Sequence, residues 1–66
     1  MTAQELARRL KALRAQKRLT QAKLAARAGL SLGYVKRLEA GYHDPALMTL
    51  TKLARGLGVK IAQLVE

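Results

Sequence analysis

Apolar residues recur every three or four positions along almost the whole chain, and no segment shows the strict alternation typical of a strand. This spacing places apolar side chains on one face of a helix. It predicts five short helices, at residues 3–17, 21–28, 32–40, 46–57 and 60–65. We therefore expect an all-α fold, a compact bundle of five short helices in a single domain over residues 1–66. The expected inward positions are Leu6, Leu10, Leu13, Leu24, Ala25, Ala28, Val35, Leu38, Leu47, Leu50, Leu53, Ala54, Leu57, Ile61, Leu64 and Val65.

Residues that cap helices stand at the ends of these segments. Thr2 and Glu5 have the spacing of a capping box, in which each side chain binds the backbone N–H of the other residue. Thr20 and Ser31 can each accept from the free N–H groups of the turn that follows. Gly29 can end the preceding helix in the left-handed conformation.

The loop before the fourth segment ends in Asp44 followed by Pro45. An aspartate at the N-cap and a proline at the first helical position favour the start of a helix. We therefore expect Asp44 to cap the helix of residues 46–57.

Residues 20–41 predict two short helices joined by a tight turn, with Leu30 filling the corner. This is the helix-turn-helix pattern, in which the second helix enters the DNA major groove. Paired helices are common in proteins, so the spacing alone does not establish DNA binding.

The charge distribution strengthens the DNA-binding hypothesis. The chain has a formal net charge of +9 and a pI near 11.0, which attracts a polyanion such as DNA, RNA or an anionic membrane. Between Leu6 and Leu38 there is no acidic residue. The same stretch contains ten bases: Arg8, Arg9, Lys11, Arg14, Lys17, Arg18, Lys23, Arg27, Lys36 and Arg37.

Other function classes fit less well. Recognition of single-stranded RNA usually needs aromatic stacking surfaces, and the chain has only two tyrosines and no Phe or Trp. A membrane-surface helix would need a large exposed apolar face, whereas these capped helices share their apolar residues in a core. An enzyme would need a nucleophile–base pair, a phosphate loop or paired carboxylates in a cleft. The single His43, without cysteine, builds no metal site, and no cofactor is expected.

The whole chain resembles the lambda-repressor-like, Cro/C1-type (XRE) helix-turn-helix domain of phage repressors and small bacterial regulators. The matching residues include Leu19-Thr20-Gln21, Leu24-Ala25, Gly29-Leu30-Ser31, Gly33-Tyr34-Val35, Arg37 to Gly41, Pro45, Leu53-Ala54 and Leu57-Gly58-Val59. The resemblance implies a transcriptional regulator, or an engineered DNA binder of that fold, that binds double-stranded DNA through a recognition helix at about 32–40. It also implies a cytoplasmic, nucleoid-associated protein of bacterial or phage origin. An antitoxin-like module that binds a protein partner through the same fold is the alternative.

The resemblance also assigns roles to individual positions. It places base contacts at Leu32, Gly33, Lys36 and Arg37, and a phosphate contact at Gln21, which opens the first helix of the motif. Further expected phosphate contacts are Ser31, Tyr34, Lys17, Lys23, Tyr42 and His43. Arg14 and Glu39 match an ion pair that ties the first helix to the third. Family members usually dimerise on DNA, but a monomer also fits this chain.

A helical wheel of residues 32–40 agrees with these roles. Val35 and Leu38 point inward, whereas Gly33, Lys36, Arg37 and Ala40 point away. Arg37 can bind guanine O6 and N7 bidentately, and Lys36 either reads guanine or contacts a phosphate. Two alternatives are open for Leu32: it covers a thymine methyl or is buried in the domain. Two are also open for Tyr34: its hydroxyl reaches a phosphate or its ring packs half-buried on the domain. Glu39 lies beside the inward residues, where a lone carboxylate would be costly without a partner.

Overall fold

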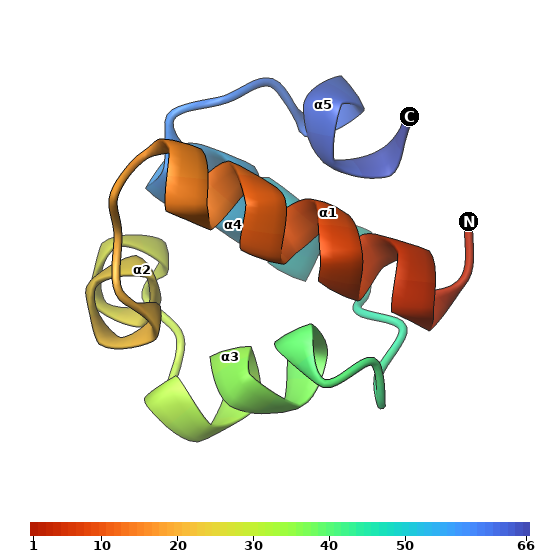
Figure 1. Ribbon diagram of the computed structural model, residues 1–66, viewed down its shortest axis with the longest axis horizontal. Helices are drawn as coiled ribbons and strands as arrows, with labels where there is room; N and C mark the ends of the chain where they lie inside the picture. The colour runs from red at the N-terminus through yellow and green to blue at the C-terminus, as the bar shows by residue number, and fades with distance from the viewer.

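The computed structural model describes residues 1–66 and contains five α-helices and no strand. The helices are α1 (Ala3–Gln16), α2 (Gln21–Ala28), α3 (Leu32–Glu39), α4 (Leu47–Leu57) and α5 (Ile61–Val65). The all-α fold and the five segments predicted from the sequence are confirmed. Figure 1 shows α1 crossing in front of α4, with α2 at one end, α3 below and α5 above. None of the helices combines the length and apolar character needed to cross a membrane.

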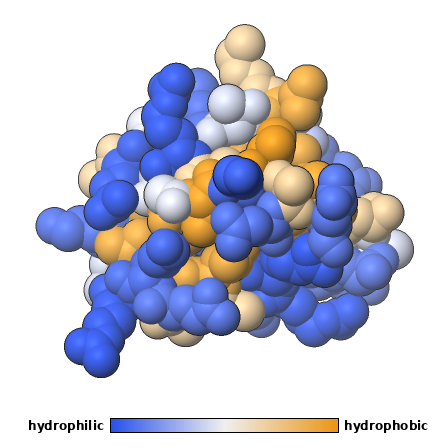
Figure 2. Space-filling view, turned by 90° about the horizontal axis from the view of Figure 1, so that it is seen from above, coloured by the Kyte–Doolittle hydropathy of each residue, from blue (hydrophilic) through white to orange (hydrophobic).

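A leucine-rich core lies between these helices. The side chains of Leu10, Leu24, Val35, Leu38 and Leu53 have no exposed surface, and each comes from a segment that the apolar pattern placed inward. Helix α3 packs on α1 and α2, so its inner side is held by two helices while its outer side remains free. The opposite side of the molecule bears α1 and α5, and there hydrophobic residues reach the surface in a strip that runs between hydrophilic ones (Figure 2).

The predicted caps of the first three helices are confirmed. The backbone N–H of Glu5 donates to the Thr2 hydroxyl at 3.1 Å, and the Thr2 N–H donates to the Glu5 carboxylate at 2.9 Å. Thr20 and Ser31 accept from the third residue of their helices at 3.0 and 3.1 Å. Gly29 has φ +71°, a left-handed conformation that glycine adopts at little steric cost. The turn between α2 and α3 is therefore fixed by local backbone chemistry.

The predicted start of α4 is wrong. Asp44 does not cap the helix, because α4 begins at Leu47 after an extended Ala46 whose side chain makes no capping bond. Pro45 instead lines a hollow with Leu6 of α1, so this loop is used for packing against another helix. Leu47 was expected to point inward but is 70% exposed, because the first turn of α4 extends beyond the core.

Three other helix boundaries differ from the expected ones by one residue. Lys17 and Ala40 are C-caps of α1 and α3, and Lys60 is the N-cap of α5, where we expected helical residues. The loop after α1 contains Arg18 at φ +57°, a left-handed conformation that is uncommon outside glycine. No pattern of residues predicted this turn, because arginine has no local preference for the left-handed conformation.

Helices α2 and α4 approach each other closely at Gly56. A Cβ atom at this position would lie 3.1 Å from the backbone N and the Cβ of Ala28, which is tighter than ordinary packing. Arg27 donates from Nε to the Gly56 carbonyl oxygen at 2.7 Å across the same contact. The small side chains thus allow the two helices to meet through their backbones.

We predict that Gly56→Ala lowers the free energy of unfolding by up to about 2 kcal/mol. Overpacking at a contact with a neighbouring backbone costs about 1–3 kcal/mol, which exceeds the roughly 1 kcal/mol that alanine contributes through helix propensity. Urea denaturation followed by circular dichroism measures the change.

Gly33→Ala is the matched control, because it is also a glycine within a helix. A Cβ at Gly33 would meet only the Arg37 side chain, at an ordinary 3.5 Å. This variant should be at least as stable as the parent chain. Equal stabilisation by both substitutions would show that the α2–α4 contact is not tight.

Candidate nucleic-acid interface

The outer side of α3 forms an exposed surface made of short and cationic side chains. Gly33, Lys36, Arg37 and Ala40 are exposed, whereas Val35 and Leu38 on the other side of the helix are fully buried. This arrangement agrees with the helical wheel. The small residues leave the helix backbone accessible, and the two bases give the surface its charge.

Leu32 is the first residue of α3, and its side chain is 39% exposed. Of the two alternatives expected for this residue, a thymine contact or burial, burial is therefore excluded. Its neighbour Ser31 is exposed and uses its hydroxyl to cap α3. Tyr34 is half-buried and packs against the core, which agrees with the packing alternative for its ring.

An aromatic cluster flanks the exposed surface of α3. The guanidinium carbon of Arg37 lies 5.8 Å from the centre of the Tyr34 ring, within the range of a cation–π contact. The ring of His43, in the loop after α3, lies 5.9 Å from the Tyr34 ring at an angle of 51°. Three side chains predicted to contact DNA are therefore brought together, whereas Tyr42 next to them is 79% exposed.

A polar network joins α1, α2 and α3 beneath this surface. Arg14 donates from Nε to Glu39 Oε2 at 2.6 Å and from Nη2 to Glu39 Oε1 at 3.0 Å, so the ion pair is bidentate. The Glu39 side chain is 3% exposed and that of Arg14 is 21% exposed. The hydrogen bonds to Glu39 raise the pKa of Arg14 above its ordinary value, against the opposing effect of burial. The pair expected from the resemblance is thus present and shielded from water.

Two further contacts complete the network, and sequence reasoning missed both. Gln21 donates from Nε2 to Glu39 Oε1 at 3.0 Å, and Arg14 donates from Nη1 to the Leu19 carbonyl oxygen at 2.8 Å. The second contact holds the loop that leads into α2. One of the two could have been expected from the sequence, because a buried carboxylate needs several donors. A bidentate arginine leaves some acceptor sites on the carboxylate oxygens unfilled, so a further donor such as Gln21 is required.

The remaining predicted phosphate contacts lie away from α3. Lys17 caps the end of α1 and Lys23 lies in the first turn of α2, and both are exposed. Some other bases are used within the protein. Arg9 donates to the Gln63 carbonyl oxygen at 3.4 Å, and Arg14 and Arg27 have the acceptors described above. These arginines keep their positive charge, but part of their hydrogen-bonding capacity is used inside the protein.

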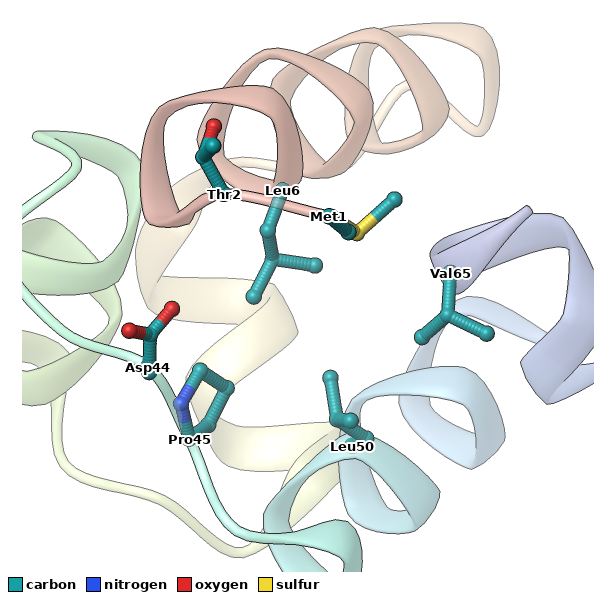
Figure 3. Close-up of a pocket in the computed structure, with 7 residues that line it drawn as sticks. All are labelled: Met1, Thr2, Leu6, Asp44, Pro45, Leu50 and Val65. Atoms are coloured by element: carbon teal, nitrogen blue, oxygen red, sulfur yellow. The ribbon is translucent and has the colours of Figure 1, made fainter.

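A hollow of about 160 Å³ lies where the two ends of the chain meet (Figure 3). Its lining comes from the start of α1, the loop before α4, α4 itself and α5, and includes Leu6, Asp44, Leu50 and Val65. An apolar lining with one carboxylate does not suit a nucleic acid. The exposed side of α3 is the better candidate site.

Comparison with known proteins agrees with this geometry. The helix-turn-helix family model matches residues 10–64, which include all of α2, the turn and α3. The chain belongs to this family of Cro/C1-type helix-turn-helix proteins.

Relatives of this helix-turn-helix chain include an immunity repressor protein of Bacillus phage phi105, which is 39% identical over 57 residues. That alignment covers 86% of the chain but only 40% of the repressor, so the chain spans less than half of this relative's length. An uncharacterized HTH-type transcriptional regulator of Sinorhizobium fredii is 45% identical over 53 residues, which are 80% of the chain and 69% of the regulator.

Among solved structures, the restriction-modification controller protein C.AhdI of Aeromonas hydrophila superposes with a TM-score of 0.91. It is 34% identical, and the alignment covers 94% of each chain. The family model and these relatives show that the chain shares its helix-turn-helix domain with a phage repressor, a transcriptional regulator and a controller protein.

The buried network generates a prediction about stability. Glu39→Ala leaves the Arg14 guanidinium without its carboxylate and removes an acceptor from Gln21, so it should lower the free energy of unfolding by about 2–4 kcal/mol. Replacement of both Arg14 and Glu39 by apolar residues should recover part of this loss. Urea denaturation of the single and double variants gives the coupling energy. A coupling energy near zero would show that leucine packing alone holds α1 against α3.

Proposed function

We propose that the chain is a single DNA-binding domain that places α3 in the major groove and reads base edges with the exposed face of that helix. The observation that supports this most directly is the composition of that face. Leu32, Gly33, Lys36 and Arg37 are all exposed on a helix whose other side is fully buried. A rigid helix with short residues next to cationic ones can approach base pairs closely and donate hydrogen bonds to guanine.

Within this proposal, contacts with the DNA backbone orient the helix. Gln21 opens α2, where the free N–H groups of a helix N-terminus favour phosphate. One amide N–H of Gln21 donates to Glu39, and the amide nitrogen has a second N–H for a phosphate oxygen. Lys17, Lys23, Ser31, Tyr42 and His43 supply further exposed donors around the motif. Such contacts fix the register on the duplex but do not read sequence directly.

A second copy of the chain on the same duplex is part of the proposal. One short recognition helix reads few base pairs, and two copies on half-sites one helical turn apart would multiply its specificity. Selection from a random duplex library, read together with sedimentation on and off DNA, tests this. A palindromic site bound by two chains supports the dimer, whereas a single unrepeated half-site bound by one chain contradicts it.

The first functional prediction concerns salt. Binding to the selected duplex should weaken steeply as salt rises, because each neutralised phosphate releases condensed counterions. Several exposed bases near the backbone should give a log–log slope of magnitude about 4–7. Fluorescence anisotropy at a series of salt concentrations measures this slope. A flat response would contradict nucleic-acid binding as the function.

The second functional prediction separates base reading from backbone binding. Arg37→Ala should cost about 1–3 kcal/mol on the preferred duplex and relax the preference at one base position. Arg37→Lys is the matched control: it keeps the charge but loses the planar fork of the guanidinium, so it should weaken the preference while retaining the salt slope.

Gln21→Ala should weaken binding to all duplexes by a similar factor, since a phosphate contact has no direct sequence information. Affinities are compared after denaturation curves have established that each variant is folded under the binding conditions. Equal weakening of every duplex by Arg37→Ala would show that Arg37 contacts the backbone rather than a base.

A further inference from the structure

The guanidinium of Arg37 lies one turn back from the residue's own position on α3. A Cβ atom on Gly33 would lie 3.5 Å from Arg37 Nη1, so the head of the side chain rests beside the first turn of the helix. Long side chains on helices normally lean toward the N-terminus in this way. The first turn of a recognition helix is the part that meets base edges. A residue near the end of α3 can therefore deliver its charge to the beginning of the helix.

Tyr34 provides the surface along which Arg37 leans back. The Arg37 guanidinium carbon lies 5.8 Å from the centre of the Tyr34 ring, three residues earlier on the same helix. The ring has limited freedom of its own, since it is half-buried, packs against the core and meets the His43 ring at 5.9 Å. An exposed arginine elsewhere on the surface would sample many rotamers. Here one side of its head faces the aromatic ring of Tyr34, and the first turn of α3 at Gly33 lies beside it.

We propose that Tyr34 is a positioning residue that holds the Arg37 guanidinium at the start of α3 for base reading. Its phenol ring acts through Arg37 rather than on DNA. This differs from the phosphate contact expected for Tyr34, which would require its hydroxyl. This role of Tyr34 rests on the proposed base contact by Arg37. It explains why the Arg37 guanidinium is aimed at the base edges before DNA is bound.

The test compares Tyr34→Phe with Tyr34→Leu. Phenylalanine keeps the aromatic face and removes the hydroxyl, whereas leucine keeps an apolar side chain for the core and removes the face. Each variant is measured on the selected duplex and on duplexes changed at the base pair that Arg37 reads. Both variants are also made in the Arg37→Ala background. The free protein is examined by NMR, in which a ring above the guanidinium shifts the Arg37 side-chain resonances.

Tyr34→Leu should reduce the preference at that one base pair by about two- to five-fold, the range that corresponds to a cation–π contact at an exposed site. Tyr34→Phe should preserve the preference. In the Arg37→Ala background Tyr34→Leu should have no further effect on it. The Arg37 resonances of the free protein should move in Tyr34→Leu and remain nearly unchanged in Tyr34→Phe.

Four results would overturn the inference. Equal loss of affinity in Tyr34→Phe and Tyr34→Leu on every duplex would show that the hydroxyl contacts phosphate. Unchanged Arg37 resonances in Tyr34→Leu would show that the ring does not hold the guanidinium. An intact base preference in Tyr34→Leu, with a loss in Arg37→Ala, would show that Arg37 reads its base unaided. If Arg37→Ala itself keeps the preference, base reading by Arg37, and with it this inference, is excluded.

Discussion

The buried carboxylate of Glu39 is the constraint on which the arrangement of the first three helices depends. A carboxylate that is 3% exposed must have its acceptor sites filled, because an unpaired buried charge is strongly unfavourable. Arg14 and Gln21 supply three N–H donors from two different helices. The requirement therefore determines where the end of α1 and the start of α2 lie relative to the end of α3. The same network links a proposed phosphate contact to the rigid body of the recognition helix.

Packing has to supply the remaining stability, since a chain of 66 residues without cysteine buries a small core and has no disulfides. Leucine fills most of that core, and Gly56 lets α4 meet α2 at backbone distance. Large side chains would hold these helices further apart. This close approach packs α2 tightly against α4, and α2 in turn packs against the inner side of α3. The exposed face of α3 therefore lies on layers of closely packed side chains.

The two sides of α3 depend on different physical effects. Burial of Val35 and Leu38 fixes the helix in the core, whereas the outer face has short residues and an arginine beside an aromatic ring. A charged side chain that is already positioned before binding loses less conformational entropy when it binds. Arg9, Arg14 and Arg27 bind acceptors within the protein. These three side chains therefore have fewer N–H groups free for a polyanion, although their charge is unchanged.

The sequence alone determined the helices, the caps at Thr2, Thr20 and Ser31, and the turn at Gly29, because these depend on interactions between residues a few positions apart. It also indicated the outward face of α3, since that follows from helical periodicity. Only the tertiary structure decided the non-helical segment 44–46, the exposure of Leu47, the close contact at Gly56 and the bond from Gln21 to Glu39. Each of these depends on which surface of a distant helix lies opposite, and local spacing does not specify that surface.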